Sequence, residues 1–233
     1  WGTNEDANEE LHKILEKQYI FSYSKPVRLI AKLIQTINNR DAIILDFFSG
    51  SATTAHAVMQ LNAEDGGKRK FIMVQLPEKT DEKSEAFKAG YKNICEIGKE
   101  RIRRAGEKIK EEAGLNGQDL DIGFRVLKLD SSNMKDIYYS ADEYDQGMLE
   151  NMQLNTKEDR TDLDLLFGCL VDWGLELDKP YTTKVINGHK VHIYNDGDLV
   201  ACFEKDLDMK TIDEIAKLQA LRVVFCDNSF IDS

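Results

Sequence analysis

The fold of this chain is decided by residues 42–55, which read Ala42-Ile43-Ile44-Leu45-Asp46-Phe47-Phe48-Ser49-Gly50-Ser51-Ala52-Thr53-Thr54-Ala55. The first half is an apolar run that ends in an acid, a pattern typical of a strand buried on both faces. Small residues then indicate a tight turn, and a helix is predicted over residues 52–61. After a glycine pair at 66–67, the apolar run at 71–76 predicts a second buried strand. Parallel strands need such a crossover, so this order predicts part of a parallel α/β sheet.

Further helices are predicted on both sides of this unit. Apolar residues at helical spacing predict helices over residues 7–17 and 26–38, the second with Pro26 in its first turn. Residues 84–112 predict one or two more. Their charged run at 99–104 pairs opposite charges at helical spacing, which favours a solvated helix face over the alternative, a contact with phosphate. The face that the second helix is expected to bury consists of Val27, Leu29, Ile30, Leu33, Ile34 and Ile37.

The pattern changes after Gly114 and Gly117, so we place a domain boundary there, between residues 1–114 and 115–233. The second part predicts a smaller α/β domain with a largely antiparallel sheet. Its predicted elements are a strand at 124–129, an irregular or partly helical acidic stretch at 138–155, a helix at 161–176, a hairpin at 183–194 that turns at Asn187-Gly188, a strand at 199–203, a helix at 212–221 and a strand at 222–226. The helix at 161–176 is expected to bury Leu163, Leu166, Phe167, Leu170 and Val171.

Charge is distributed unevenly between the two parts. The net charge of the 233 residues is −11, but residues 1–112 hold 19 Lys and Arg against 18 Asp and Glu, whereas residues 113–233 hold 12 against 24. A surface as acidic as the second part repels a phosphate backbone. We therefore expect this part to meet protein or solvent, with Tyr138, Tyr139 and Tyr144 marking either a partner surface or a weakly ordered loop.

Composition also excludes several classes of protein. No run approaches the roughly 18 apolar residues of a membrane helix, and the N-terminal residues lack the segments of a signal peptide, so we expect a soluble, cytoplasmic protein without a membrane partner. The acidic start without Met is typical of a piece cut from a longer protein. The cysteines are far apart, with no histidine at ligand spacing, and are expected to be buried free thiols, not metal ligands. They are Cys95, Cys169, Cys202 and Cys226.

The turn at residues 49–52 has the chemistry of a ligand site. Small residues after a buried strand let the backbone pass close to a ligand, and the helix that follows presents free N–H groups to an anion or carboxylate. The turn has one glycine only, so it matches neither the dinucleotide fingerprint G-x-G-x-x-G nor the phosphate-loop pattern. A nucleotide phosphate is therefore not the expected guest.

Residues 46–54 resemble the D-x-F-x-G-S-G-T-T motif of amino-methylating DNA methyltransferases, in which this turn holds S-adenosylmethionine. The resemblance implies part of a Rossmann-like methyltransferase sheet. Ala52 stands where the family has its second glycine. Binding should survive if Ala52 is helical, and affinity should suffer if it needs a positive φ.

Two flanking segments extend the resemblance. Residues 21–30 resemble the family's K-P-x-x-L segment, which implies that Lys25 faces the carboxylate of the cofactor. After the second strand, Gln75 or Glu78 could accept hydrogen bonds from the ribose hydroxyls. The full set of residues expected to bind the cofactor is Ser24, Lys25, Pro26, Asp46, Phe47, Phe48, Ser49, Gly50, Ser51, Ala52, Thr53, Thr54, Gln75 and Glu78.

The order of these segments implies a permuted class, whose catalytic Asp-Pro-Pro-Tyr motif lies upstream of them. This chain contains no such motif, so we assign it no catalytic residue. Residues 227–230 are the nearest match, but they lack both prolines and are expected to form a turn after an edge strand. Residues 71–78, 90–94 and 100–105 further resemble modification subunits of type III restriction-modification systems. The resemblance is strong over residues 8–110.

The resemblance implies a site-specific adenine-N6 DNA methyltransferase that acts on a flipped base. The chain would supply the cofactor-binding half and be inactive alone. Its implied partners are double-stranded DNA through the missing upstream half, a restriction subunit and a second modification subunit. Two alternatives remain: a module for assembly or dimerisation, acting through the acidic domain, and a small-molecule methyltransferase, which fits the turn but not the segment order.

Aromatic and imidazole side chains near these segments have competing interpretations. His56 is expected to be a packed helix histidine, not a base or metal ligand, and His189 and His192 are expected at the surface of the hairpin. Because alternate strand residues face opposite sides, one of Phe47 and Phe48 is expected in the core, and the other is a candidate for stacking on adenine.

Overall fold

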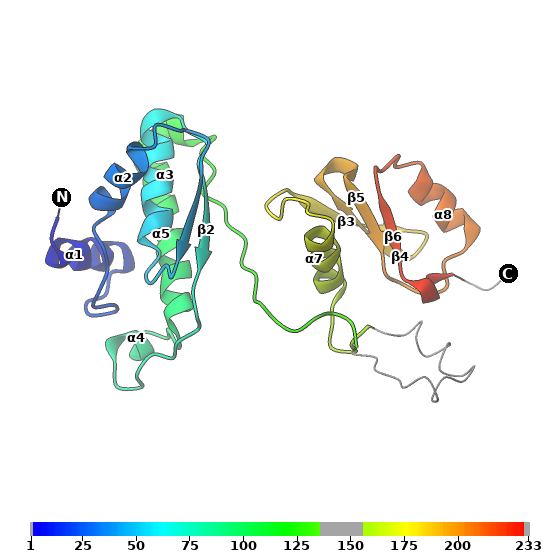
Figure 1. The fold of residues 1–233 in the computed structure, drawn as a ribbon, viewed down its shortest axis with the longest axis horizontal. Helices are drawn as coiled ribbons and strands as arrows, with labels where there is room; N and C mark the ends of the chain where they lie inside the picture. The colour runs from blue at the N-terminus through cyan, green and yellow to red at the C-terminus, as the bar shows by residue number, and fades with distance from the viewer. Residues whose placement is uncertain (1, 136–155, 231–233) are drawn as a thin grey trace. The chain divides into compact units, whose positions relative to one another are not determined.

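The computed structural model describes residues 2–135 and 156–230, which fall into two compact units, unit 1 (Trp1–Phe124) and unit 2 (Arg125–Ser233) (Figure 1). Unit 1 contains α1 (Asn4–Leu15), α2 (Val27–Gln35), β1 (Ile43–Phe47), α3 (Thr53–Asp65), β2 (Lys70–Val74), α4 (Glu85–Lys88), α5 (Ile94–Ala113) and the 3₁₀ turn η1 (Gly114–Gly117). Unit 2 contains α7 (Asp162–Asp172), β3 (Tyr181–Ile186), β4 (His189–Tyr194), η3 (Asn195–Gly197), β5 (Leu199–Cys202), α8 (Met209–Ala216), β6 (Val223–Phe225) and η4 (Asp227–Ser229). Within the described ranges no helix is both long and apolar enough to cross a membrane.

Unit 1 is built around the predicted strand–helix–strand unit. β1 and β2 pair in parallel with Leu45 opposite Ile72, and α3 connects them. The helix ends at Gly66, whose φ of +67° is easy for glycine, so the glycine pair stops the helix as predicted. The parallel arrangement predicted from residues 42–76 is confirmed.

Within unit 1, the described residues cover only one face of this two-stranded sheet. Ile44 and Phe71 pack against a buried cluster of α2 and α3, whereas Leu45 and Ile72 are half exposed. The prediction of strands buried on both faces is therefore wrong here, because the helices of this unit lie against one side. The exposed face, formed by Ile43, Leu45, Phe47, Ile72 and Val74, is called the open sheet face below.

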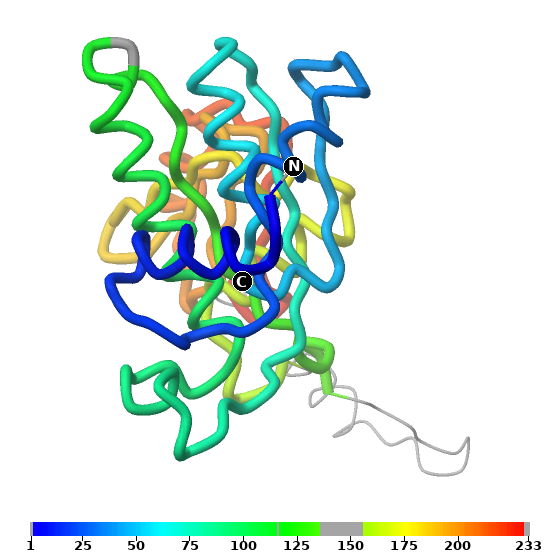
Figure 2. The backbone as a smooth tube through the Cα atoms, turned by 90° about the vertical axis from the view of Figure 1, so that its left-hand side faces the viewer, coloured from blue at the N-terminus to red at the C-terminus, as the bar shows by residue number. Residues whose placement is uncertain are grey.

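The core of unit 1 lies where α1, α3 and α5 meet. A capping box between Thr3 and Asp6 starts α1, and α1 runs crosswise to α5 (Figure 2). Leu15 and Ile97 are fully buried at this crossing. The segment that follows η1 packs onto the same core through partly buried Leu120, Ile122 and Phe124.

Unit 2 is a mixed sheet with a helix on each face (Figure 1). The strand order is β3-β4-β5-β6, antiparallel except for the last pair. All four residues of β5 are buried, because Leu199 and Ala201 pack towards α7, while Val200 and Cys202 pack towards α8. The predicted hairpin and largely antiparallel sheet are confirmed.

The strand predicted at residues 124–129 is wrong. These residues are irregular, and the side chain of Arg125 fastens them instead. Its guanidinium donates to the carbonyl oxygens of Leu177 and Lys179, and it lies 5.1 Å from the ring centroid of Phe167 and 5.6 Å from that of Tyr181. This apolar run is therefore a loop. The hydrogen bonds of the Arg125 side chain hold it in place, and it pairs with no strand among the described residues.

Several predicted apolar faces are shifted or narrower than expected. Leu33 and Ile37 near the end of α2 are exposed, and so are Leu163 and Val171 on α7, where Leu165 is buried instead. A 3₁₀ turn over residues 227–229 follows β6, where a turn was expected. Tyr138, Tyr139 and Tyr144 lie outside the described residues.

Candidate functional site

The turn between β1 and α3 is held by backbone hydrogen bonds and two left-handed residues. The N–H of Ser49 donates to the carbonyl oxygen of Val74 at 3.0 Å, and the N–H of Ala52 donates to that of Ser49 at 2.8 Å. Gly50 has a φ of +53° and Ala52 a φ of +60°. Ala52 therefore has the positive φ considered above, and the helix begins only at Thr53. No side chain caps α3, so no side-chain acceptor satisfies its first N–H groups.

Side chains from both strands fix the turn from below. The N–H of Gly50 donates to the amide Oε1 of Gln75 at 2.7 Å, and the Thr54 hydroxyl donates to Oδ2 of Asp46 at 2.5 Å. Asp46 lies near the carboxyl end of β1, and Gln75 directly follows that of β2, at the edge where ligands bind in open α/β sheets. Gln75 is thus already occupied by the turn in this structure.

A buried arginine brings the predicted segments together. The Nη1 of Arg101, on α5, donates to the hydroxyl oxygens of Ser24 at 2.9 Å, Ser51 at 2.9 Å and Thr53 at 2.7 Å. These three residues are buried and come from the K-P segment, the turn and the first position of α3. We call Ser24, Ser51, Thr53 and Arg101 the hydroxyl cluster.

Arg101 is the functional candidate that sequence reasoning missed. The predicted solvated face at 99–104 is wrong at this position, because Arg101 is fully buried (0% exposed). Burial lowers its pKa to about 10, since desolvation disfavours the charged form. A signal was present: Arg101 continues the spacing of Ile97, Ala105 and Ile109, the buried stripe of the helix.

The close approach of α5 to the turn depends on a glycine. A Cβ placed on Gly98 would lie 3.4 Å from the carbonyl oxygen of Gly50 and 3.5 Å from the Cβ of Ala52. A larger side chain would push the helix, and with it Arg101, away from the turn.

Other predicted site residues are not drawn into the cluster. Lys25 and Glu78 are exposed, and within the described part of the chain no hydrogen bond joins either side chain to the turn. Pro26 is buried beside the start of α2. Phe47 and Phe48 are both exposed, so the expectation that one lies in the core is wrong.

The predicted position is confirmed for His56 and wrong for His192. His56 is packed as predicted, and burial lowers its pKa to about 3, helped by the positive charges of Arg101 and Lys108. His192 is buried and contacts the Thr183 hydroxyl through Nδ1 at 2.9 Å, so the surface position predicted for it is wrong. His189 is partly exposed and lies 3.3 Å from Glu204.

The cysteines are free thiols as predicted, although Cys95, Cys169 and Cys226 are only partly buried. No group of acidic, histidine and cysteine side chains in the described residues is arranged to hold a metal ion.

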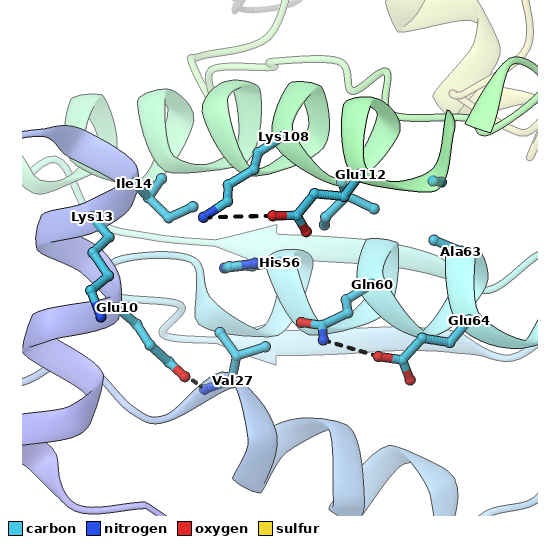
Figure 3. A pocket seen from close by; sticks show the side chains of 12 residues that line it. Glu10, Lys13, Ile14, Val27, His56, Gln60, Ala63, Glu64, Lys108 and Glu112 are labelled. Carbon is cyan, nitrogen blue, oxygen red and sulfur yellow. Dashed lines mark hydrogen bonds and ion pairs between the residues drawn. The ribbon is translucent and has the colours of Figure 1, made fainter. Parts of the chain in front are cut away.

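A hollow of about 380 Å³ lies elsewhere in unit 1, between α1, α3 and α5 (Figure 3). His56 stands in its middle, and Lys108 and Glu112 of α5 line one side. Its rim carries both positive and negative side chains, so it favours no particular charge on a ligand. None of the predicted cofactor-binding residues lines it, and we place the candidate site at the turn.

Comparison with protein families decides the class of unit 1. Residues 1–108 match the N6/N4 family described as DNA methylase. These residues belong to that DNA methylase family. The matched range contains the turn, the hydroxyl cluster and both parallel strands.

Relatives of this DNA methylase segment are much longer proteins. The chain is 40% identical over 124 residues to the Mod subunit of the type III restriction-modification enzyme StyLTI from Salmonella typhimurium, covering 53% of this chain and 19% of the relative. It is 32% identical over 191 residues to the EcoP15I Mod subunit of Escherichia coli, covering 80% and 27%. It is 39% identical over 93 residues to the type II methyltransferase M.KpnI of Klebsiella pneumoniae, covering 40% and 22%. The chain thus spans about a fifth to a quarter of these relatives.

Proposed function

We propose that this chain supplies the S-adenosylmethionine-binding half of an adenine-N6 DNA methyltransferase of a restriction-modification system, with unit 1 as part of a Rossmann-like methyltransferase sheet. The observation that carries the proposal is the convergence of the K-P segment, the turn and the start of α3 on Arg101. These segments match the family motifs, and the relatives named above are Mod subunits and a type II methyltransferase.

The residues present fit this cofactor. Bound S-adenosylmethionine would supply an activated methyl group, a carboxylate and a ribose. The uncapped start of α3 offers N–H groups to the carboxylate, and Gly50 leaves room for close approach. Lys25 is exposed and directly follows Ser24, whose hydroxyl lies 3.0 Å from that of Ser51, and we assign to it a positive charge that attracts the same carboxylate. Gln75 positions Gly50, so we assign contact with the ribose to Glu78 in preference to Gln75.

The open sheet face supports the proposal that this chain is only the cofactor-binding half of a methyltransferase. Apolar strand residues that are exposed to solvent form either a binding surface or a site of aggregation. The relatives are about four to five times longer than the matched region, as the 19–27% coverage indicates. We propose that the remainder of a full-length protein covers this face and supplies the catalytic motif and the DNA-binding surface.

Calorimetric titration of the 233-residue chain with S-adenosylmethionine tests the proposal. We expect binding that Gly50→Val weakens at least about tenfold, because valine is strained at a φ of +53° and meets the Phe21 ring. Lys25→Ala should weaken binding several-fold, whereas Lys32→Ala, an exposed lysine on α2, should not. No heat of binding with the unsubstituted chain would count against the proposal.

A second candidate function is subunit assembly through unit 2. The observation that favours it is charge, because residues 125–233 hold 12 Lys and Arg against 22 Asp and Glu. Such a surface suits contact with a basic protein partner better than contact with DNA. Sedimentation of residues 113–233, alone and with a restriction subunit, discriminates: a monomer without affinity would remove this candidate.

A further inference from the structure

Arg101 carries a positive charge that no acidic group balances at close range. Among the described residues no carboxylate lies within 4.0 Å of its guanidinium, and Glu10 is the one acid that acts on it over a longer distance. Two of its nitrogens, Nε and Nη2, are buried without a hydrogen-bond partner. A fully buried charge in this state is costly unless a further group pairs with it.

The direction of the hydrogen bonds between Arg101 and the three hydroxyl groups is fixed by their chemistry. A guanidinium can only donate, so the oxygens of Ser24, Ser51 and Thr53 all accept from Arg101, and they share the two protons of its Nη1. Their own O–H protons must go elsewhere. The hydroxyl oxygens approach one another at Ser24–Ser51 (3.0 Å) and Ser24–Thr53 (3.4 Å). These two contacts use at most two of the three protons, so at least one O–H has no acceptor within the hydroxyl cluster.

We infer that Arg101 is a positioning residue for the carboxylate of the cofactor: because it donates to the oxygens of Ser24, Ser51 and Thr53, it leaves their O–H groups to act as donors, and it places a positive charge next to them. The inference rests on the function proposed above. A carboxylate at the start of α3 would meet hydroxyl donors whose orientation the arginine fixes, and it would balance the buried charge. A ligand without the carboxylate would gain neither effect.

A structural arginine and a positioning arginine differ in which ligands their loss affects. A structural arginine holds the K-P segment against the turn, and its loss weakens every ligand of that site alike. An arginine that acts on the carboxylate couples to that group alone. A double-mutant cycle between residue and ligand measures this coupling.

The experiment compares S-adenosylmethionine with decarboxylated S-adenosylmethionine, using the 233-residue chain and its Arg101→Met variant. We expect Arg101→Met to weaken S-adenosylmethionine about tenfold or more, the range for hydrogen bonds to a charged group. The decarboxylated ligand should lose less than about threefold on the same substitution. The matched control is Arg103→Met, an exposed arginine on the same helix, which should change neither affinity.

Milder substitutions guard against misfolding. Arg101→Lys keeps the charge with fewer fixed donors and should recover part of the affinity for S-adenosylmethionine. Ser51→Ala keeps Arg101 and should again weaken only the carboxylate-bearing ligand. Circular dichroism and thermal unfolding report whether each variant is folded.

Two results would overturn the inference. In the first, Arg101→Met and Ser51→Ala weaken both ligands equally, which leaves the function proposed above intact and makes Arg101 structural. In the second, neither ligand binds the unsubstituted chain, which removes the proposed function and the inference with it.

Discussion

Ala52 shows how a single backbone angle is satisfied without glycine. A φ of +60° is about 1–2 kcal/mol less favourable for an L-residue than the right-handed region. The Ala52 methyl group is buried against the core of unit 1, and this burial contributes about 0.8 kcal/mol of stability. The angle belongs to the folded turn, so its unfavourable energy is part of the free energy of folding. We therefore expect the alanine to weaken cofactor binding less than its place in the motif implies.

The first prediction concerns substitutions at this residue. Ala52→Gly should change the free energy of unfolding by less than about 1 kcal/mol, because relief of the angle offsets the lost methyl contact and the entropy of glycine. Ala52→Val should lower it by about 2 kcal/mol or more, since a β-branched residue is worse at this angle and has Gly98 beside it. Urea unfolding measures both. Equal stability of the glycine and valine variants would contradict the left-handed geometry.

The second prediction uses the buried imidazole of His56. The pKa of His56 is lowered to about 3 in the folded protein, mainly by burial. The unfolded chain binds this proton below about pH 6.5, whereas the folded protein does so only near pH 3. The stabilising effect of neutral His56 is thus complete above pH 6.5 and is lost as the pH falls towards 3.

Unfolding free energies at pH 7, 6, 5 and 4 check this prediction. We expect a fall of up to about 1 kcal/mol per pH unit that His56→Gln reduces. His12→Gln, at a less buried histidine of the same unit, is the comparison. A pH slope that His56→Gln leaves unchanged would refute the assignment to His56.

At the scale of elements, the open sheet face gives the third prediction. Ile44 packs against the buried cluster of α2 and α3, whereas its neighbour Leu45 points to the open sheet face and is 55% exposed. Ile44→Ala should therefore lower the free energy of unfolding by about 2 kcal/mol or more, and Leu45→Ala by less than about 1 kcal/mol. Chemical unfolding of the two variants measures the difference. A larger loss at Leu45 would mean that the face is covered in solution.

Elements were predictable where local pattern and tertiary context agree. The strand–turn–helix–strand unit, the hairpin and the helix end at Gly66 follow from apolar runs and glycine positions, and all are present. The pattern could not tell which faces are covered, because Leu45 and Leu33 are as apolar as buried residues. The strand expected at 124–129 failed because Arg125, a residue with no local signature, fastens that segment.

The candidate site was predictable to the same extent. The turn and the K-P segment could be chosen from sequence, and three of their residues lie together in the structure. Arg101 is 50 residues from Ser51 and 77 from Ser24, so no local spacing connects them. The charged run around it resembles a solvated face, and only its place in the buried stripe of α5 distinguishes Arg101 from Arg103.

For the molecule as a whole, binding of S-adenosylmethionine and transfer of its methyl group can be separated. The last prediction follows from this separation. Asp46, the acid nearest the turn, has Oδ2 engaged by Thr54, and the sequence has three prolines, none adjacent, so it contains no Asp-Pro-Pro-Tyr motif. Neither Asp46 nor an Asp-Pro-Pro-Tyr motif is therefore available in the described part of unit 1 to accept the proton of an adenine amine. We expect the 233-residue chain to bind S-adenosylmethionine and transfer no methyl group to DNA.

Incorporation of labelled methyl groups into duplex DNA measures methyl transfer. Binding of S-adenosylmethionine is measured in the same preparation as a control, because a misfolded sample would also transfer no methyl group. The acidic unit 2 adds a second expectation, because its charge repels the phosphate backbone: DNA should be retained weakly and should be released as salt rises. Methyl transfer that disappears in Gly50→Val would show that the chain holds a complete active site, and the assignment of a half would then be wrong.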